Sequence, residues 1–267
     1  MIDVIFTIIG ATLYIAATIV LFKQLTTPES EKNKHTVLIL GITGAIFHAD
    51  ILARHIFTDS GLQMGITHVA SLATWFVTCL LIITALKKPI ENLGLFILPL
   101  AALTLTLQYF MPVDHIVNTA DHKGLGAHIV LSILAYSLLG LAAVQAVLLS
   151  IKEKHLHNRR PGGLIAALPP LETMESLLVQ MIVIGFALQT TSLISGYVHL
   201  EDMFAQNLAH KTILSIIAWA VFAILLTCRK LYGWRGKTLV RWTISGFFTL
   251  LLAYFGSKYV LEIILGR

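Results

Sequence analysis

Eight stretches of mostly apolar residues constrain the fold of this chain more than any other feature. A helix needs roughly 20 such residues to cross the hydrocarbon core of a bilayer. The stretches lie at about residues 2–22, 36–57, 65–86, 90–111, 125–150, 174–198, 210–229 and 239–264. They predict an all-α, polytopic integral membrane protein with about eight transmembrane helices, forming a single membrane domain over residues 1–267.

The composition supports a membrane protein over a soluble one. Hydrophobic residues make up 57% of the chain and charged residues only 12%, whereas soluble domains carry about a quarter charged residues. The stretch at 2–22 has no basic leader and no small-residue cleavage site, so we expect a retained helix rather than a signal peptide. Pro99 lies inside the stretch at 90–111 and predicts a kink there.

The lysine and arginine residues predict the orientation. Segments 23–35, 87–91, 152–172 and 229–241 hold all of the 19 basic residues except Arg54, Lys123, Lys211, Lys258 and Arg267. Because cytoplasmic loops of membrane proteins carry an excess of basic residues, both termini are expected on the periplasmic side. The basic loops suit an anionic lipid surface, so the charge requires no nucleic-acid partner. For the segment "YGWRGKTLVRW" we expect a lipid-headgroup and topology role, or alternatively a docking site for a cytoplasmic partner.

The histidines gather on one predicted side of the membrane. In this topology only His35, His155 and His157 of the 11 histidines are cytoplasmic. The others lie on the outer side or within the membrane: His48, His55, His68, His115, His122, His128, His199 and His210. Neutral imidazole is a common ligand for metals and haem iron. For His55, His115 and His122 we favour a simple interfacial role.

His128 lies about one helical turn inside the stretch at 125–150. Ser132 and Tyr136 follow at i+4 and i+8, so a polar stripe descends from it, and such a stripe should face other helices rather than lipid. Burial disfavours the charged imidazolium, so the ring should be neutral and able to coordinate iron. The alternative is a hydrogen bond to a neighbouring helix.

His48 lies deeper, near the middle of the predicted membrane. Gly41, Gly44 and Ala45 precede it on one face and would let a helix or a flat ligand approach. Ligand binding and a helix–helix hydrogen bond remain equally open for this residue. Asp50 and Arg54, spaced i and i+4, can neutralise each other.

The helix expected at 174–198 carries Gln189, Ser192, Gly196 and His199 on one face. This face lines either a cavity or a packing seam of small residues, and we favour the seam for all but His199. Trp75 and Trp219 suit a planar porphyrin, although aromatic residues at helical spacing more often serve packing. No GxSxG, HExxH, P-loop or GxGxxG motif is present, so no enzyme activity is expected.

Four segments carry a resemblance to a known family. They are "GLGAHIVLSILAYSLLG", "LPPLETMESLLVQMIVIGFALQTTSLISG", "HKTILSIIAWAVFAIL" and "YGWRGKTLVRWTISGFFTLLLAYFGSKYV". Together, and in this order, they resemble the cytochrome c assembly family, which includes CcsA-like and HemX-like proteins. The resemblance implies a bacterial inner-membrane protein and haem b as a cofactor. It also implies haem or cytochrome c maturation proteins as partners alongside the lipid bilayer.

The resemblance also implies roles for single residues. His128 matches the outer-side histidine that ligates haem in CcsA-type proteins, and its motif is intact. His48 is the leading candidate for a second ligand or a supporting residue, followed by His199 and His210. Lys211 and Trp219 match residues of the family's helix that follows the haem segment.

Three departures separate the chain from haem-attaching members. The tryptophan-rich WGxxWxWDPKE-type segment is replaced by "YVHLEDMFAQNLAHKT" after Gly196. Thr227 stands where the family has a membrane histidine, and "SKYVLEIILGR" replaces the last outer histidine. These departures argue against direct attachment of haem to apocytochrome c and favour a haem-handling accessory or HemX-type regulatory protein. A transporter or ion-homeostasis partner, and a structural subunit without a cofactor, are the alternatives.

Overall fold

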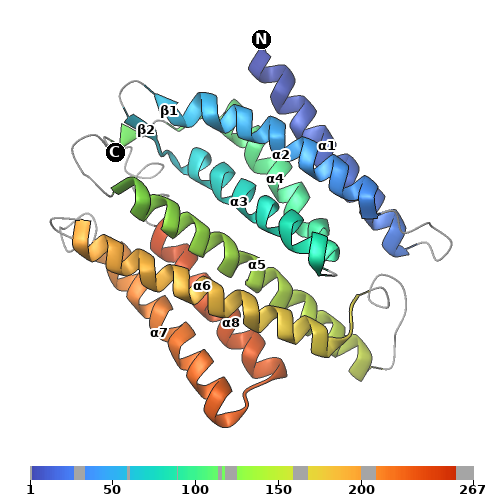
Figure 1. Ribbon diagram of the computed structural model, residues 1–267, viewed down its shortest axis with the longest axis vertical. Coiled ribbons are helices and arrows are strands. Elements are labelled where there is room, and N and C mark those ends of the chain that lie inside the picture. Colours follow the sequence, from blue (N-terminus) through green and yellow to red (C-terminus); the bar gives the residue numbers. More distant parts are fainter. Residues whose placement is uncertain are drawn as a thin grey trace. The chain divides into compact units, whose positions relative to one another are not determined.

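The computed structural model describes residues 2–26, 34–58, 61–88, 90–113, 116–117, 125–158, 168–199 and 209–256. Within these ranges, 8 helices are long and apolar enough to cross a membrane (Figure 1). The prediction of an all-α, polytopic membrane protein is therefore confirmed. The periplasmic location of the two termini stays a prediction.

The helices agree closely with the eight apolar stretches. Their bounds are α1 (Ile2–Thr26), α2 (Lys34–Ile56), α3 (Ile66–Lys87), α4 (Gly94–Phe110), α5 (Leu125–His157), α6 (Leu171–His199), α7 (Ala209–Tyr232) and α8 (Gly236–Leu251). A 3₁₀ turn, Glu91–Leu93, precedes α4, and a π-helical turn, Leu252–Gly256, follows α8. The part of the last stretch beyond residue 256 lies outside the described residues.

The end of α5 differs from the prediction. The apolar stretch ends at about residue 150, and the basic segment that we expected outside the membrane begins at residue 152, but α5 continues to His157. The added residues are mainly lysine, glutamate, leucine and histidine, which form helix in water as well as in lipid. Hydropathy marks where a helix leaves the apolar region, and the backbone helix continues beyond that point.

The chain forms two compact units. Unit 1 consists of Met1–Val117 with His155–Pro169, and unit 2 consists of Asn118–Lys154 with Pro170–Arg267. The single domain predicted for residues 1–267 stays a prediction.

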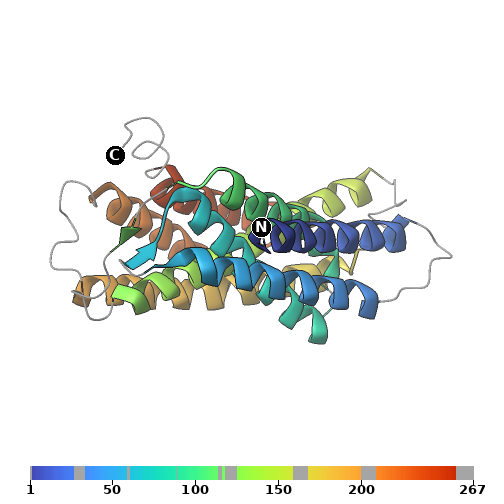
Figure 2. The ribbon, with the colours of Figure 1, turned by 90° about the horizontal axis from the view of Figure 1, so that it is seen from above.

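In unit 1, α1 packs along α2 and α4. Figures 1 and 2 both show α1 lying beside α2. One core cluster of this unit consists of Tyr14, Ala17, Leu98, Ala101 and Ala102. Small residues let the helices approach closely, because a Cβ added at Gly44 would lie only 3.0 Å from the ring of Tyr14.

A small antiparallel sheet, which the sequence did not predict, belongs to unit 1. Its strands are β1 (Phe57–Thr58), β2 (Gly61–Gln63) and β3 (Ile116–Val117), in the order β1-β2-β3. Leu62 of β2 pairs with Phe57 on one side and with Val117 on the other. Strands of two or three residues are too short to show the alternating pattern from which strands are predicted.

In unit 2, α7 and α8 form a helical hairpin. The turn between them contains Gly233 at φ 65° and Gly236 at φ 54°, in the left-handed region that glycine adopts at least cost. The "GWRG" motif is therefore explained by the turn geometry. On the packed faces, Gly246 lies against the ring of Phe222 and Gly185 against Leu139, so small residues again allow close helix contacts.

Candidate functional site

His128 is fixed to α6 by a hydrogen bond through one ring nitrogen. Its Nδ1 lies 2.9 Å from the backbone carbonyl oxygen of Ser192. A carbonyl oxygen can only accept, so Nδ1 carries the proton and donates it. In the neutral ring this places the lone pair on Nε2, which is the nitrogen that can coordinate a metal.

The stripe below His128 faces the bundle, as the spacing predicted. The Ser132 hydroxyl lies 2.7 Å from that of Ser192 and also donates to the carbonyl of His128 at 2.8 Å. Tyr136 contacts the ring of Tyr254 edge to face, at 5.9 Å between centroids. Two residues of the stripe on α5, His128 and Ser132, thus contact the same residue of α6, Ser192, which fixes the position of the His128 ring.

The polar face of α6 is a packing seam over its described part. Gln189 and Ser192 are buried, and the Gln189 amide donates to the carbonyl of Ser215 on α7 at 3.2 Å. Trp219 on α7 donates from Nε1 to the Thr190 hydroxyl at 2.9 Å and stacks on Phe186 at 5.5 Å. The packing role is therefore confirmed for Gln189, Ser192 and Trp219.

His48 is fully buried in unit 1 and joins three helices. Its Nε2 lies 2.8 Å from the Ser71 hydroxyl on α3, and its Nδ1 lies 3.3 Å from the Tyr14 hydroxyl on α1. Trp75, also on α3, donates from Nε1 to the carbonyl of Ala45 at 2.9 Å. Both ring nitrogens of His48 are thus engaged in helix–helix contacts, and Tyr14 occupies the space beside Gly44.

For the other two predicted ligands, His199 and His210, the structure gives the position of the backbone in the helices. His199 is the last residue of α6, and His210 is the second residue of α7. Both belong to unit 2, as does His128, whereas His48 belongs to unit 1. Within the described residues, no group of three or more histidine, cysteine, aspartate or glutamate side chains could hold a metal ion.

The predicted neutralisation of Asp50 by Arg54 is confirmed. The Arg54 Nε lies 2.6 Å from Oδ2 of Asp50, and Asp3 of α1 adds a longer contact at 3.9 Å. The guanidinium also lies 5.7 Å from the ring centroid of Phe6. These contacts tie α1 to α2 near the N-terminal end of α1.

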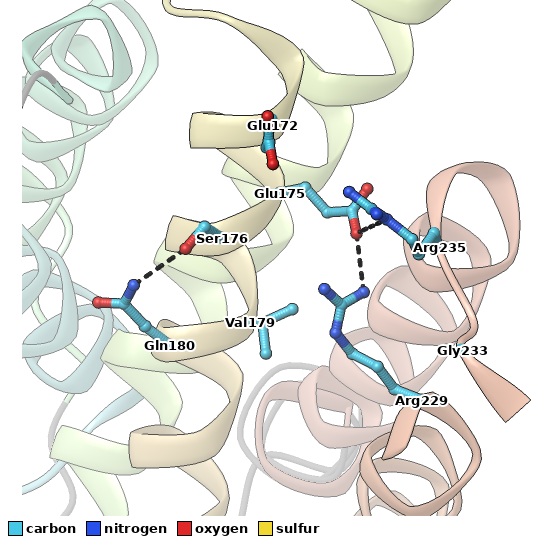
Figure 3. Close-up of a pocket in the computed structure, with 8 residues that line it drawn as sticks. All are labelled: Glu172, Glu175, Ser176, Val179, Gln180, Arg229, Gly233 and Arg235. Atoms are coloured by element: carbon cyan, nitrogen blue, oxygen red, sulfur yellow. Dashed lines mark hydrogen bonds and ion pairs between the residues drawn. The ribbon is translucent and has the colours of Figure 1, made fainter. Parts of the chain in front are cut away.

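An ion cluster at the start of α6 was missed from the sequence. Glu175 accepts from Arg229 Nη1 and Arg235 Nε on the same oxygen, Oε1, each at 2.9 Å (Figure 3). Arg229 Nη1 also donates to the carbonyl of Trp234 at 2.8 Å. Arg235, which lies in the segment that we expected to bind lipid headgroups, therefore binds a carboxylate of the chain itself. The available signal was Glu175 itself, an acidic residue just before the apolar run that begins at Leu177.

The cluster borders a cavity of about 390 Å³ in unit 2. Its lining residues come from the first turns of α6, the last turn of α7 and the turn that follows: Glu172, Glu175, Ser176, Val179, Gln180, Arg229, Gly233 and Arg235 (Figure 3). Charged groups of both signs therefore line this cavity.

Comparisons with known proteins agree with the resemblance seen in the sequence. The family model described as "Cytochrome C assembly protein" matches residues 6–265. "Inner membrane protein YpjD" of Escherichia coli (strain K12) is 30% identical over 237 residues, which cover 86% of this chain and 88% of that protein. No solved structure matches the chain.

Two further relatives match over shorter ranges. "Protein HemX" of Brevibacillus brevis is 22% identical over 147 residues, covering 54% of each chain. "Cytochrome c biogenesis protein CcsA" of Prochlorococcus marinus (strain NATL1A) is 34% identical over 87 residues, covering 32% of this chain and 28% of that protein.

Eight membrane-spanning helices and the match to an inner-membrane relative over most of both chains make this a multi-pass protein of the inner membrane. The family model covers nearly the whole length of the chain. The chain belongs to the cytochrome c assembly protein family.

Proposed function

We propose that this chain is a haem-binding accessory membrane protein, acting in cytochrome c assembly or in HemX-type tetrapyrrole regulation, and that His128 supplies an axial ligand through Nε2. One observation carries the proposal: the hydrogen bond from Nδ1 of His128 to the carbonyl of Ser192. Metal-binding histidines almost always donate their other ring N–H to a carbonyl or carboxylate, which fixes the tautomer and the ring orientation.

The residues present fit this role. The imidazole is held on a rigid pair of helices rather than on a loop, because Ser132 and Ser192 join α5 to α6 directly beside it. Bound haem would supply an iron centre that accepts an imidazole nitrogen. The chain's own contribution is to hold His128 in the tautomer and orientation that such a centre needs.

His199 and His210 are our candidates for a second ligand. His199 lies seven residues after Ser192, about two turns further along α6 and on the same face. His210 opens α7, which contacts that face of α6 through Gln189. His48 is the weaker candidate, because Tyr14 and Ser71 already engage both of its ring nitrogens.

A haem titration of the full-length protein in detergent tests the proposal. We expect the wild type to develop a Soret band at one haem per chain, and His128→Ala to lose at least about tenfold in affinity and to shift the band, since metal sites lose that much when even a supporting group is removed. His157→Ala is the matched control, because it removes an exposed histidine from the same helix. If the wild type binds no haem, the transporter or ion-homeostasis alternative is favoured instead.

The proposal also requires His128 to lie toward the periplasm. We expect a reporter fused after Arg267 to be active only if the reporter works in the periplasm, and the same reporter inserted at Gly233 to be active only if it works in the cytoplasm. The reason is the concentration of basic residues in segments 23–35, 87–91, 152–172 and 229–241. Cytoplasmic activity of the fusion at Arg267 would reverse the topology and place His128 on the wrong side.

A further inference from the structure

The cavity beside Glu175 is lined by one cationic and one anionic side chain, Arg235 and Glu172, that can still bind a ligand. The charge of Glu175 is neutralised by the chain's own arginines, because Arg229 and Arg235 both donate to its Oε1. Arg235 contributes only its Nε, and its side chain is 62% exposed. A guanidinium carries five N–H donors, so Arg235 keeps donor capacity beyond this ion pair.

Glu172 supplies the opposite charge. It is exposed, lines the same cavity, and makes no ion pair with any residue in the described part of the chain. Figure 3 shows it on α6, on the N-terminal side of Glu175. Glu175 balances the charge of one of the two arginines. The cavity thus offers one cationic and one anionic group to a ligand.

The cavity lies at the ends of two membrane-spanning helices, where we expect lipid headgroups. Its walls come from the first turns of α6 and the end of α7, which are the ends of two membrane-spanning helices. Trp234 and Trp242 lie next to each other in this region, at 5.3 Å between ring centroids, and tryptophan is enriched at membrane interfaces. Tyr232 and Leu231 at the end of α7 are both exposed.

We propose that this cavity binds the headgroup of a zwitterionic aminophospholipid, phosphatidylethanolamine. The phosphate accepts from the spare donors of Arg235, and the ammonium donates to the carboxylate of Glu172. The volume of about 390 Å³ falls within the usual range of small-ligand sites, roughly 300–1,000 Å³. A purely anionic headgroup leaves Glu172 unpaired beside it, and a choline headgroup has no N–H to donate.

Lipid retention by the full-length protein tests this inference. Detergent-purified protein is titrated with phosphatidylethanolamine, phosphatidylcholine or phosphatidylglycerol of identical acyl chains, and bound lipid is counted by native mass spectrometry. We expect phosphatidylethanolamine to bind about tenfold more tightly than phosphatidylcholine, the effect of one charge-assisted hydrogen bond. Phosphatidylglycerol should bind more weakly than phosphatidylethanolamine.

Three variants separate the groups involved. Glu172→Gln should remove the preference for ethanolamine over choline without weakening phosphatidylglycerol, and Arg235→Gln should weaken all three lipids. Lys237→Gln is the control, since it removes a nearby positive charge that does not line the cavity. The inference is overturned if Glu172→Gln keeps the ethanolamine preference, or if the wild type prefers phosphatidylglycerol. If soluble glycerophosphoethanolamine displaces the lipid at equal concentration, the ligand is a free headgroup compound and the assignment to a membrane lipid is overturned.

Discussion

Glu175→Gln is expected to lower the free energy of unfolding of unit 2 by roughly 3 kcal/mol, because removal of one partner leaves a largely buried charge without compensation. The side chains of Glu175 and Arg229 are only 11% and 23% exposed. A neutral amide can still accept a hydrogen bond from one arginine, but it cannot balance two guanidinium groups. The midpoint of thermal unfolding in detergent, followed by tryptophan fluorescence, measures the loss.

Arg235→Gln is the matched control for this prediction. The Arg235 side chain is 62% exposed and donates to the same oxygen at the same distance. Exposed ion pairs contribute roughly 0–1 kcal/mol, so this variant should unfold close to the wild type. Equal destabilisation by the two substitutions would show that burial does not set the strength of the cluster.

The second large effect is expected from His48→Leu in unit 1. Leucine fills a similar volume but removes the hydrogen bonds that join the Ser71 hydroxyl and the Tyr14 hydroxyl to α2. Each buried group that loses its hydrogen bond costs about 1–3 kcal/mol, so we expect a loss of roughly 3 kcal/mol in stability. His35→Leu on the same helix is the control, because His35 is exposed.

The same variant separates the two roles considered for His48. If its role is to join α1, α2 and α3, the folded fraction of His48→Leu should bind haem with an unchanged Soret band. Loss of the band from a variant that unfolds at the wild-type temperature would instead make His48 a haem ligand.

The helices were predictable because lipid imposes one strong requirement, a continuous apolar length of about 20 residues. Within the described residues all eight stretches are helical. Structural features that do not depend on contact with lipid were not predicted from the sequence. The extension of α5 to His157 consists of polar residues outside the apolar stretch, and the short strands around Leu62 form through pairing with distant segments.

In the candidate site, too, some features could be predicted from the sequence and others could not. The spacing of His128, Ser132 and Tyr136 predicted a stripe that faces the bundle, because it depends only on the geometry of one helix. The partner, Ser192, depends on how far α6 is shifted along α5, and one sequence contains no measure of that shift. For the same reason the ion pair between Glu175 and Arg229, which lie 54 residues apart, could not be predicted from the sequence.

A cavity variant tests the central claim, ligation of haem by Nε2 of His128, most directly. His128→Gly should bind haem poorly by itself, and added imidazole should restore both the haem affinity and the wild-type Soret position, because free imidazole can enter the space left by the side chain and coordinate the iron. His157→Gly should need no imidazole. Wild-type haem occupancy and an unchanged Soret band in His128→Gly without imidazole would contradict the claim.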